Sequence, residues 1–251
     1  MIVATYNWSL IWQNKSQLLH GLLTALEVAA VALVLSVIIG LILALLRMGK
    51  PPLSWAAAAY INVFRGVPAL VSVIWVYFGW SLILGINFTV FQAGVIALML
   101  LYSAFIAEIY RAALEAIPKG QREAGLALGM HPFRVFAQVV LPQATKIAIP
   151  NIGSMFIGMV KDTSTFTVIG LLEVVRVTQN LNSTTFQPFV LYTAAAGVYV
   201  MAAFALDFIF RTIEKSLATP PSGRVASTIS RRRRQRLEAV MLRLEALSGR
   251  T

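Results

Sequence analysis

The 251-residue chain is 58% hydrophobic and only 12% charged, whereas soluble domains carry about 25% charged residues, so lipid is its expected main solvent. It has no cysteine, which excludes disulfides and thiolate metal sites, and its two histidines, His20 and His131, lie far apart in sequence. The net charge of +11 is typical either of a nucleic-acid-binding protein or of a membrane protein with basic cytoplasmic loops.

Apolar runs long enough to cross a membrane recur along the chain. A membrane helix needs about 20 mostly apolar residues. The uncharged run between Arg65 and Glu108 is longer than one helix needs, and the turn signal at Gly85-Ile86-Asn87 divides it in two. A later run contains Lys161 and Asp162, and we interpret it as a fourth span that carries polar groups. The predicted spans are residues 22–46, 66–84, 90–114, 147–171 and 189–212.

The distribution of lysine and arginine predicts the orientation of these helices. With the N-terminus outside, the cytoplasmic side receives all of the 21 lysines and arginines except Lys15, Lys161 and Arg176. Cytoplasmic loops of membrane proteins carry such an excess of positive charge. We therefore expect an all-α polytopic protein with an extracytoplasmic N-terminus, and its charge requires no nucleic acid partner.

The connection between the third and fourth spans has the signals of two short helices. Residues 121–128 are good helix formers, and Gly129 suits a left-handed helix end. Pro132 suits the first turn of a second helix, residues 133–140, which we expect to stop before Pro142. Two helices around a glycine turn form a stiff knuckle, which can pass force to another protein.

This connection resembles the EAA loop of ABC importer permeases. The loop pattern is Glu-Ala-Ala, three residues, Gly, nine residues, Ile, one residue and Leu-Pro. Gly125 stands for the second Ala and Val139 for Ile, and Gly125 is expected to loosen the first helix by up to ~1 kcal/mol relative to Ala. The residues that match are Glu123, Ala124, Gly129, Leu141 and Pro142.

The resemblance extends from His20-Gly21 to Lys161-Asp162-Thr163-Ser164, and the segments between indicate the polar amino acid branch of the family. It implies a type I ABC importer permease fold in the bacterial inner membrane, with a transmembrane domain at residues 1–217 and the EAA loop at about 117–142. It further implies that the matched EAA residues couple the chain to a cytoplasmic ABC ATPase dimer. The other implied partners are a second permease subunit, alike or homologous, an extracytoplasmic solute-binding protein and the amino acid itself.

The fourth span carries a polar cluster, Lys161, Asp162, Thr163 and Ser164. Charges inside a membrane are costly, by ~2.5–3.5 kcal/mol each on insertion scales, and usually face a watery cavity or a partner. We interpret the cluster as part of the substrate pathway, with one cation and one anion for a zwitterionic amino acid. The alternative is an ion pair that only fixes helix packing. Since adjacent helical residues point about 100° apart, the two charges need not face one cavity.

The remaining polar residues predict no enzyme chemistry, cofactor or metal site. Glu108, Arg111 and Glu115 have i,i+3 and i,i+4 spacing and are expected to pair along one helix face. No G-x-x-x-x-G-K-[ST] phosphate loop occurs in the sequence, so ATP must be bound by a partner subunit.

Two questions stay open at the level of sequence. The basic cytoplasmic tail, residues 218–251, fits either a disordered topology anchor or a helix on anionic lipid. The alternative function is a self-contained secondary carrier or channel for small polar solutes, although such carriers usually contain internal repeats. The identity of the amino acid does not follow from the sequence.

Overall fold

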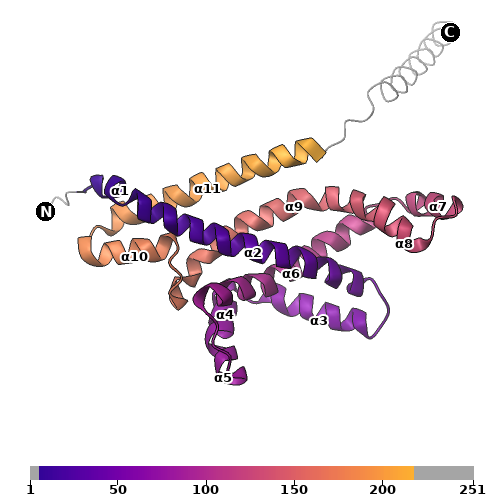
Figure 1. The fold of residues 1–251 in the computed structure, drawn as a ribbon, viewed down its shortest axis with the longest axis horizontal. Coiled ribbons are helices and arrows are strands. Elements are labelled where there is room, and N and C mark those ends of the chain that lie inside the picture. Colours follow the sequence, from indigo (N-terminus) through magenta and orange to yellow (C-terminus); the bar gives the residue numbers. More distant parts are fainter. Residues whose placement is uncertain (1–5, 218–251) are drawn as a thin grey trace, which may run out of the picture. The chain divides into compact units, whose positions relative to one another are not determined.

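The computed structural model describes residues 6–217, and every regular element within that range is helical (Figure 1). The chain divides into two compact units, Met1–Thr212 and Ile213–Thr251. The predicted basic tail, 218–251, lies outside the described residues. The elements are α1 (Ser9–Gln13), α2 (Lys15–Arg47), α3 (Leu53–Gly66), α4 (Ala69–Ile74), the π-turn η1 (Trp75–Gly79), α5 (Trp80–Leu84), α6 (Val90–Glu115), α7 (Lys119–Ala127), α8 (Pro132–Val135), the π-turn η2 (Phe136–Val140), α9 (Leu141–Asp162), the 3₁₀ helix η3 (Thr163–Ile169), α10 (Val174–Thr185) and α11 (Pro188–Leu217).

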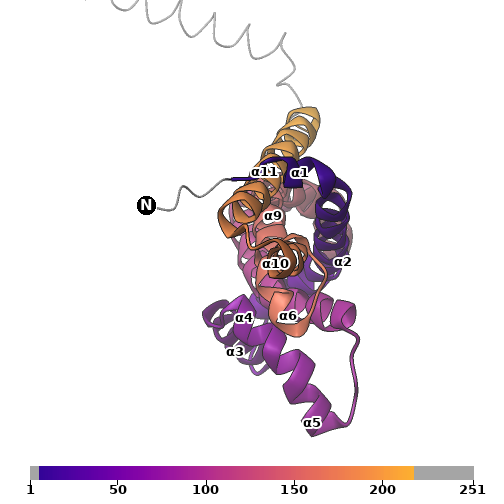
Figure 2. The same ribbon diagram turned by 90° about the vertical axis from the view of Figure 1, so that its left-hand side faces the viewer.

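The described residues contain three to five candidate membrane spans. Three single helices, α2, α6 and α11, are long and apolar enough to cross a membrane. Two bent pairs add the others: Leu53–Gly66 with Ala69–Ile83, which meet at 107°, and Pro132–Ile169 with Val174–Thr185, which meet at 47°. If each pair is one span, the total is the predicted five. Figure 2 shows α5 leading away from the other helices before the chain returns to α6.

The second span differs from the prediction. The sequence placed it at residues 66–84, but a helix of 14 residues, α3, precedes it and meets it at the sharp bend. Pro68 causes the break, because a proline disfavours helical geometry in the residue before it. Val67 is accordingly extended, with φ −92° and ψ 129°. The helix α3 was missed because its uncharged stretch, between Lys50 and Arg65, is shorter than a span requires.

The fourth span also differs from the expected single helix at residues 147–171. The α-helix ends at Asp162, continues as the 3₁₀ helix η3 and turns at Gly170, which has φ +88°. Side-chain hydroxyls satisfy carbonyls freed at this change of geometry: Thr163 donates to the Val160 carbonyl at 2.7 Å and Thr165 to the Asp162 carbonyl at 2.8 Å. The polar cluster therefore lies where the helix ends.

Small residues bring α2 close to α6. In lipid, helices associate through close packing, which favours small side chains at the contact. A Cβ added at Gly40 would lie 2.8 Å from the Ile106 Cγ2 atom, so only glycine fits there. The small residues of α2 that are buried follow one stripe: Gly21, Ala25, Ala29, Ala32, Ser36, Gly40 and Ala44.

A buried carboxylate holds the beginning of α10, a helix that the sequence analysis did not predict. Glu173 is 0% exposed and accepts hydrogen bonds from the Val175 and Arg176 backbone N–H groups at 2.7 and 2.8 Å. The Tyr199 hydroxyl of α11 donates to the same carboxylate at 2.7 Å. A Cβ at Gly21 would lie 2.9 Å from the Glu173 carbonyl carbon, so α2 packs directly on this junction.

Candidate functional site

The predicted knuckle is present as two helices around a left-handed glycine. Gly129 has φ +75°, and the chain reverses through hydrogen bonds from the Gly129 N–H to the Leu126 carbonyl, 2.9 Å, and from the Met130 N–H to the Gly125 carbonyl, 3.1 Å. Such paired bonds satisfy carbonyls that a helix end would leave free. Pro132 then begins α8, as predicted. The turn is therefore determined by local signals.

The second helix of the knuckle does not stop before Pro142, and that prediction is wrong. The helix α8 runs through the π-turn η2 into α9, so knuckle and fourth span form one continuous helical rod. A proline inside a regular helix clashes with the carbonyl four residues earlier, and a π-turn just before it widens the backbone. The Gln143 side-chain amide donates to the Val139 carbonyl at 2.7 Å within the same turn.

The matched EAA residues lie mostly on the surface of this knuckle. Glu123, Ala124, Gly129 and Pro142 are exposed, and Leu141 is half-buried. Glu123 also lines a cavity of about 370 Å³. The other residues that line it are Met48, Leu114, Glu115, Ile117, Pro118, Lys119, Arg122, Leu126 and Val140.

Three large apolar side chains of the knuckle are also exposed. Leu128 is 82% exposed, Phe133 69% and Leu126 44%. Large apolar side chains exposed on one short segment fit a protein-binding surface. We call these three residues the apolar knuckle face.

Gly125→Ala is expected to lower the stability of the knuckle, the reverse of the effect expected from helix propensity. A Cβ at Gly125 would lie 2.9 Å from the Val135 Cγ2 atom, so α7 and α8 touch through the glycine. Overpacking costs ~1–3 kcal/mol, which exceeds the ~1 kcal/mol that alanine gains in a helix. Amide hydrogen exchange of residues 121–128 measures the change.

The control for this prediction is Gly120→Ala in the same helix. A Cβ at Gly120 meets nothing within 4 Å, so alanine raises the helix propensity there without a clash. This change is therefore expected to slow amide hydrogen exchange of residues 121–128. Slower exchange in both variants would contradict the packing role of Gly125.

A pocket of about 300 Å³ lies at the break between α3 and α4. It contains Asp162, whose carboxylate accepts a hydrogen bond from the Tyr102 hydroxyl of α6 at 3.0 Å. Broken helices in membrane proteins occur where the backbone lines a cavity or is buried in protein. Val67 and Ala69, on either side of Pro68, line this pocket. We call it the Asp162 pocket.

The predicted polar cluster is not brought together in one cavity. Lys161 lines a different groove, of about 440 Å³, along α11, together with Tyr199, Asp207 and Arg211. Thr163 is buried and its hydroxyl is bonded to the backbone, while Ser164 is half-buried beside it. Asp162 is therefore the member of the cluster that lines the pocket at the helix break.

Sequence analysis missed two residues that accompany this site. Tyr102 supplies the hydrogen bond to Asp162, and Arg65 lies at the end of α3 with its guanidinium 5.7 Å from the centre of the Phe105 ring. A tyrosine in the middle of an apolar span was the available signal for Tyr102. From the sequence, Arg65 is only one of the positive charges of the cytoplasmic side, because α3 is not predicted.

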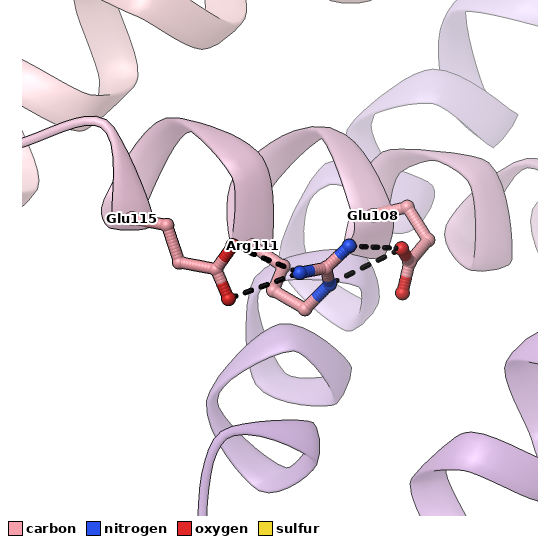
Figure 3. Close-up of polar contacts among 3 residues, drawn as sticks. All are labelled: Glu108, Arg111 and Glu115. Carbon is pink, nitrogen blue, oxygen red and sulfur yellow. Dashed lines mark hydrogen bonds and ion pairs between the residues drawn. The ribbon is translucent and has the colours of Figure 1, made fainter.

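The ion pairs expected on the third span are confirmed. Arg111 lies between two carboxylates of α6, with nitrogen–oxygen distances of 2.8 Å to Glu108 and 2.9 Å to Glu115 (Figure 3). Both bonds to Glu108 go to its Oε2 atom. Glu108 lines a cavity between α3, α6 and α9, and Glu115 lines the knuckle cavity, so Arg111 pairs with one acid from each cavity.

Comparison with known proteins gives consistent matches over most of the chain. Residues 36–219 match the family described as "Binding-protein-dependent transport system inner membrane component". The chain is 34% identical to the glutamine transport system permease protein GlnP of Escherichia coli K12 over 214 residues, which cover 84% of this chain and 98% of GlnP. It is also 34% identical to the arginine transport system permease protein ArtQ of Bacillus subtilis over 201 residues, 80% of this chain and 92% of ArtQ.

Solved structures agree with the sequence matches. A chain of an amino acid ABC transporter crystallised with histidines superposes with a TM-score of 0.78 at 32% identity, covering 84% of this chain and 99% of that one. The inward-facing MetNI methionine ABC transporter superposes with a TM-score of 0.71 at 22% identity, which supports the fold alone.

Proposed function

The chain belongs to the family of binding-protein-dependent transport system inner membrane components, and from this membership we propose that it is the permease subunit of an ATP-driven amino acid importer. The family consists of multi-pass inner-membrane transport subunits, which are not catalytic enzymes and which work with ATPase and binding-protein partners. An amino acid substrate is supported by the relatives named for glutamine and arginine and by the amino acid transporter of similar structure.

The structural observation that supports this proposal is the Asp162 pocket. An ionisable residue within a membrane span marks a substrate path by default, because its charge needs water or a partner. Asp162 lines the pocket at the break between α3 and α4, and it lies where the fourth span changes from α-helix to 3₁₀ helix. Its carboxylate can accept hydrogen bonds from the α-ammonium group of an amino acid. Lys161, on a separate groove, is proposed to fix helix packing near Asp207.

We assign coupling to the knuckle. In this proposal Glu123, Ala124, Gly129, Leu141 and Pro142 form or support the surface that docks in the ATPase. The apolar knuckle face supplies the anchors, since exposed apolar side chains that become buried dominate the energy of most interfaces. The continuous rod from α8 into α9 can carry movement of the ATPase to Asp162 at the other end of α9.

The proposed assembly is a two-fold or pseudo-two-fold pair of permeases with two ATPases. Five spans hardly enclose a path wide enough for a solute, and closed symmetric dimers are the most common oligomers. The excess of positive charge supports an N-terminus outside, where the binding protein delivers substrate, and a cytoplasmic tail.

The test is uptake into liposomes. The chain purified with its ATPase is expected to take up radiolabelled glutamine or arginine only with ATP inside the vesicle and binding protein outside. The chain alone, under a proton or sodium gradient, is expected to transport neither. Gradient-driven uptake by the chain alone would establish the secondary carrier instead.

A further inference from the structure

The segment that directly follows Asp162 is short and closely hydrogen-bonded. It consists of the 3₁₀ helix η3 and the turn that leads to Glu173. The side chain of Phe166, in the middle of η3, is 0% exposed. The turn is closed by bonds from the Leu171 N–H to the Phe166 carbonyl, 3.2 Å, and from the Glu173 N–H to the Leu171 carbonyl, 2.9 Å. Because packed segments transmit strain, a displacement of Glu173 is expected to reach Asp162.

A side chain of α11 joins the two ends of this segment. The Tyr199 hydroxyl donates to the Glu173 carboxylate at 2.7 Å, and the Thr163 side chain lies beside the same hydroxyl. A further bond fixes the middle of the segment, since the Thr167 hydroxyl donates to the Gln179 Oε1 atom of α10 at 3.0 Å. We call Glu173 and Tyr199 the η3 clamp.

The capping of α10 does not by itself require a glutamate. Helix N-caps are usually Ser, Thr, Asp or Asn, whose short side chains reach the free backbone N–H groups. Glu173 uses both carboxylate oxygens for the cap, and its Oε2 atom also accepts the bond from Tyr199. Burying a carboxylate is costly unless it is paired or hydrogen-bonded. The long, charged side chain therefore serves the bond to α11 as well as the cap.

We propose that Glu173 and Tyr199 are positioning residues for the transport site, because through η3 they fix where the Asp162 carboxylate lies. This inference rests on the proposed role of Asp162 in amino acid uptake. Neither clamp residue lines the Asp162 pocket, so both act on the substrate only through η3. A shift of η3 would alter the 3.0 Å bond that Asp162 accepts from Tyr102 of α6. Binding groups must be held within about 0.5 Å of their productive position, so a small shift is enough to lower uptake.

The first experiment is a double-mutant cycle of uptake, measured in proteoliposomes at equal amounts of assembled complex. Tyr199→Phe removes only the hydroxyl and Glu173→Gln only the charge, and each is expected to lower uptake by roughly tenfold. In the Asp162→Asn background neither change is expected to lower uptake further, since both act through Asp162. Thr178→Val is the matched control, because its buried hydroxyl bonds to the Val174 carbonyl within α10, at 2.7 Å. This control is expected to leave uptake per complex unchanged.

The second experiment follows the position of Asp162 without transport. A fluorotyrosine in place of Tyr102 reports the hydrogen bond to Asp162 through its fluorine NMR resonance, and Asp162→Asn gives the resonance of the altered contact. Tyr199→Phe and Glu173→Gln are expected to move the resonance of wild type toward that value. Thr178→Val is expected to leave it in place, because a loss of stability confined to α10 does not reach Tyr102.

Equal fold losses of uptake in both backgrounds, or an unmoved Tyr102 resonance in both clamp variants, would overturn the positioning role. The η3 clamp would then be only a helix cap, while amino acid uptake by wild type would still support the proposed function. If wild type takes up no amino acid, the proposed function fails, and the Tyr102 resonance alone decides whether the η3 clamp holds Asp162 in place.

Discussion

Asp162→Asn is expected to reduce amino acid uptake by roughly ten- to a hundredfold while the complex still assembles and hydrolyses ATP. Asparagine has the same shape but no charge, so the α-ammonium loses an ionic partner. Hydrogen bonds to charged groups contribute ~1.5–3 kcal/mol, which corresponds to this range. Uptake into membrane vesicles, compared at equal amounts of permease, measures the effect.

Two neighbouring changes serve as controls for Asp162. Tyr102→Phe removes the hydroxyl that donates to Asp162 but leaves the charge, so a smaller loss, within about tenfold, is expected. Lys161→Met removes the adjacent charge, which lines the groove along α11, and is expected to change the amount of folded protein rather than uptake per complex. Normal uptake with unchanged substrate preference in Asp162→Asn would reduce the pocket to a structural feature.

Gly129→Asp is expected to uncouple ATP hydrolysis from uptake, with uptake reduced by about a hundredfold in a chain that still inserts. An L-residue at φ +75° costs about 1–2 kcal/mol. The new carboxylate would also lie directly after Leu128 on the apolar knuckle face. A charge left unpaired in an interface costs ~2–5 kcal/mol. Parallel measurement of ATPase activity and uptake in proteoliposomes tests this expectation.

Gly120→Asp adds the same charge to the same knuckle and is the matched control. Gly120 lies in the first turn of α7, where a Cβ meets nothing within 4 Å and the helix dipole favours an acid. This variant is expected to remain coupled. If Gly129→Asp assembled and transported as well as Gly120→Asp, the knuckle could not be the coupling element.

Local sequence signals determined the class of this protein and the outline of the knuckle. Runs of apolar residues indicated five spans because each run must be long enough to cross hydrocarbon, a property of a single segment. Gly129 and Pro132 marked the turn between α7 and α8 because helix ends depend on the φ preference of individual residues. The ion pairs of Arg111 followed from spacing on one helix.

The roles of Gly125 and Pro142 were decided only by the tertiary structure. By helix propensity alone Gly125 is unfavourable in α7. Its contact with Val135, ten residues away, nevertheless leaves no room for a larger side chain. By propensity Pro142 should end the helix, but the π-turn before it lets the helix continue through the proline. These outcomes depend on packing between segments, which helix propensities do not describe.

In the candidate site, too, the sequence determined some features and the tertiary structure determined others. The sequence by itself determined that Lys161 and Asp162 are costly charges in a span, because their cost depends only on the apolar residues around them. It could not assign them to different cavities, place Tyr102 beside Asp162, or bring Arg65 and Glu108 into one cavity. Those placements follow from the bend at Gly66–Pro68 and from the way α3, α6 and α9 pack. Contacts between distant segments are set by the shapes of all their side chains together, and so only the tertiary structure decides them.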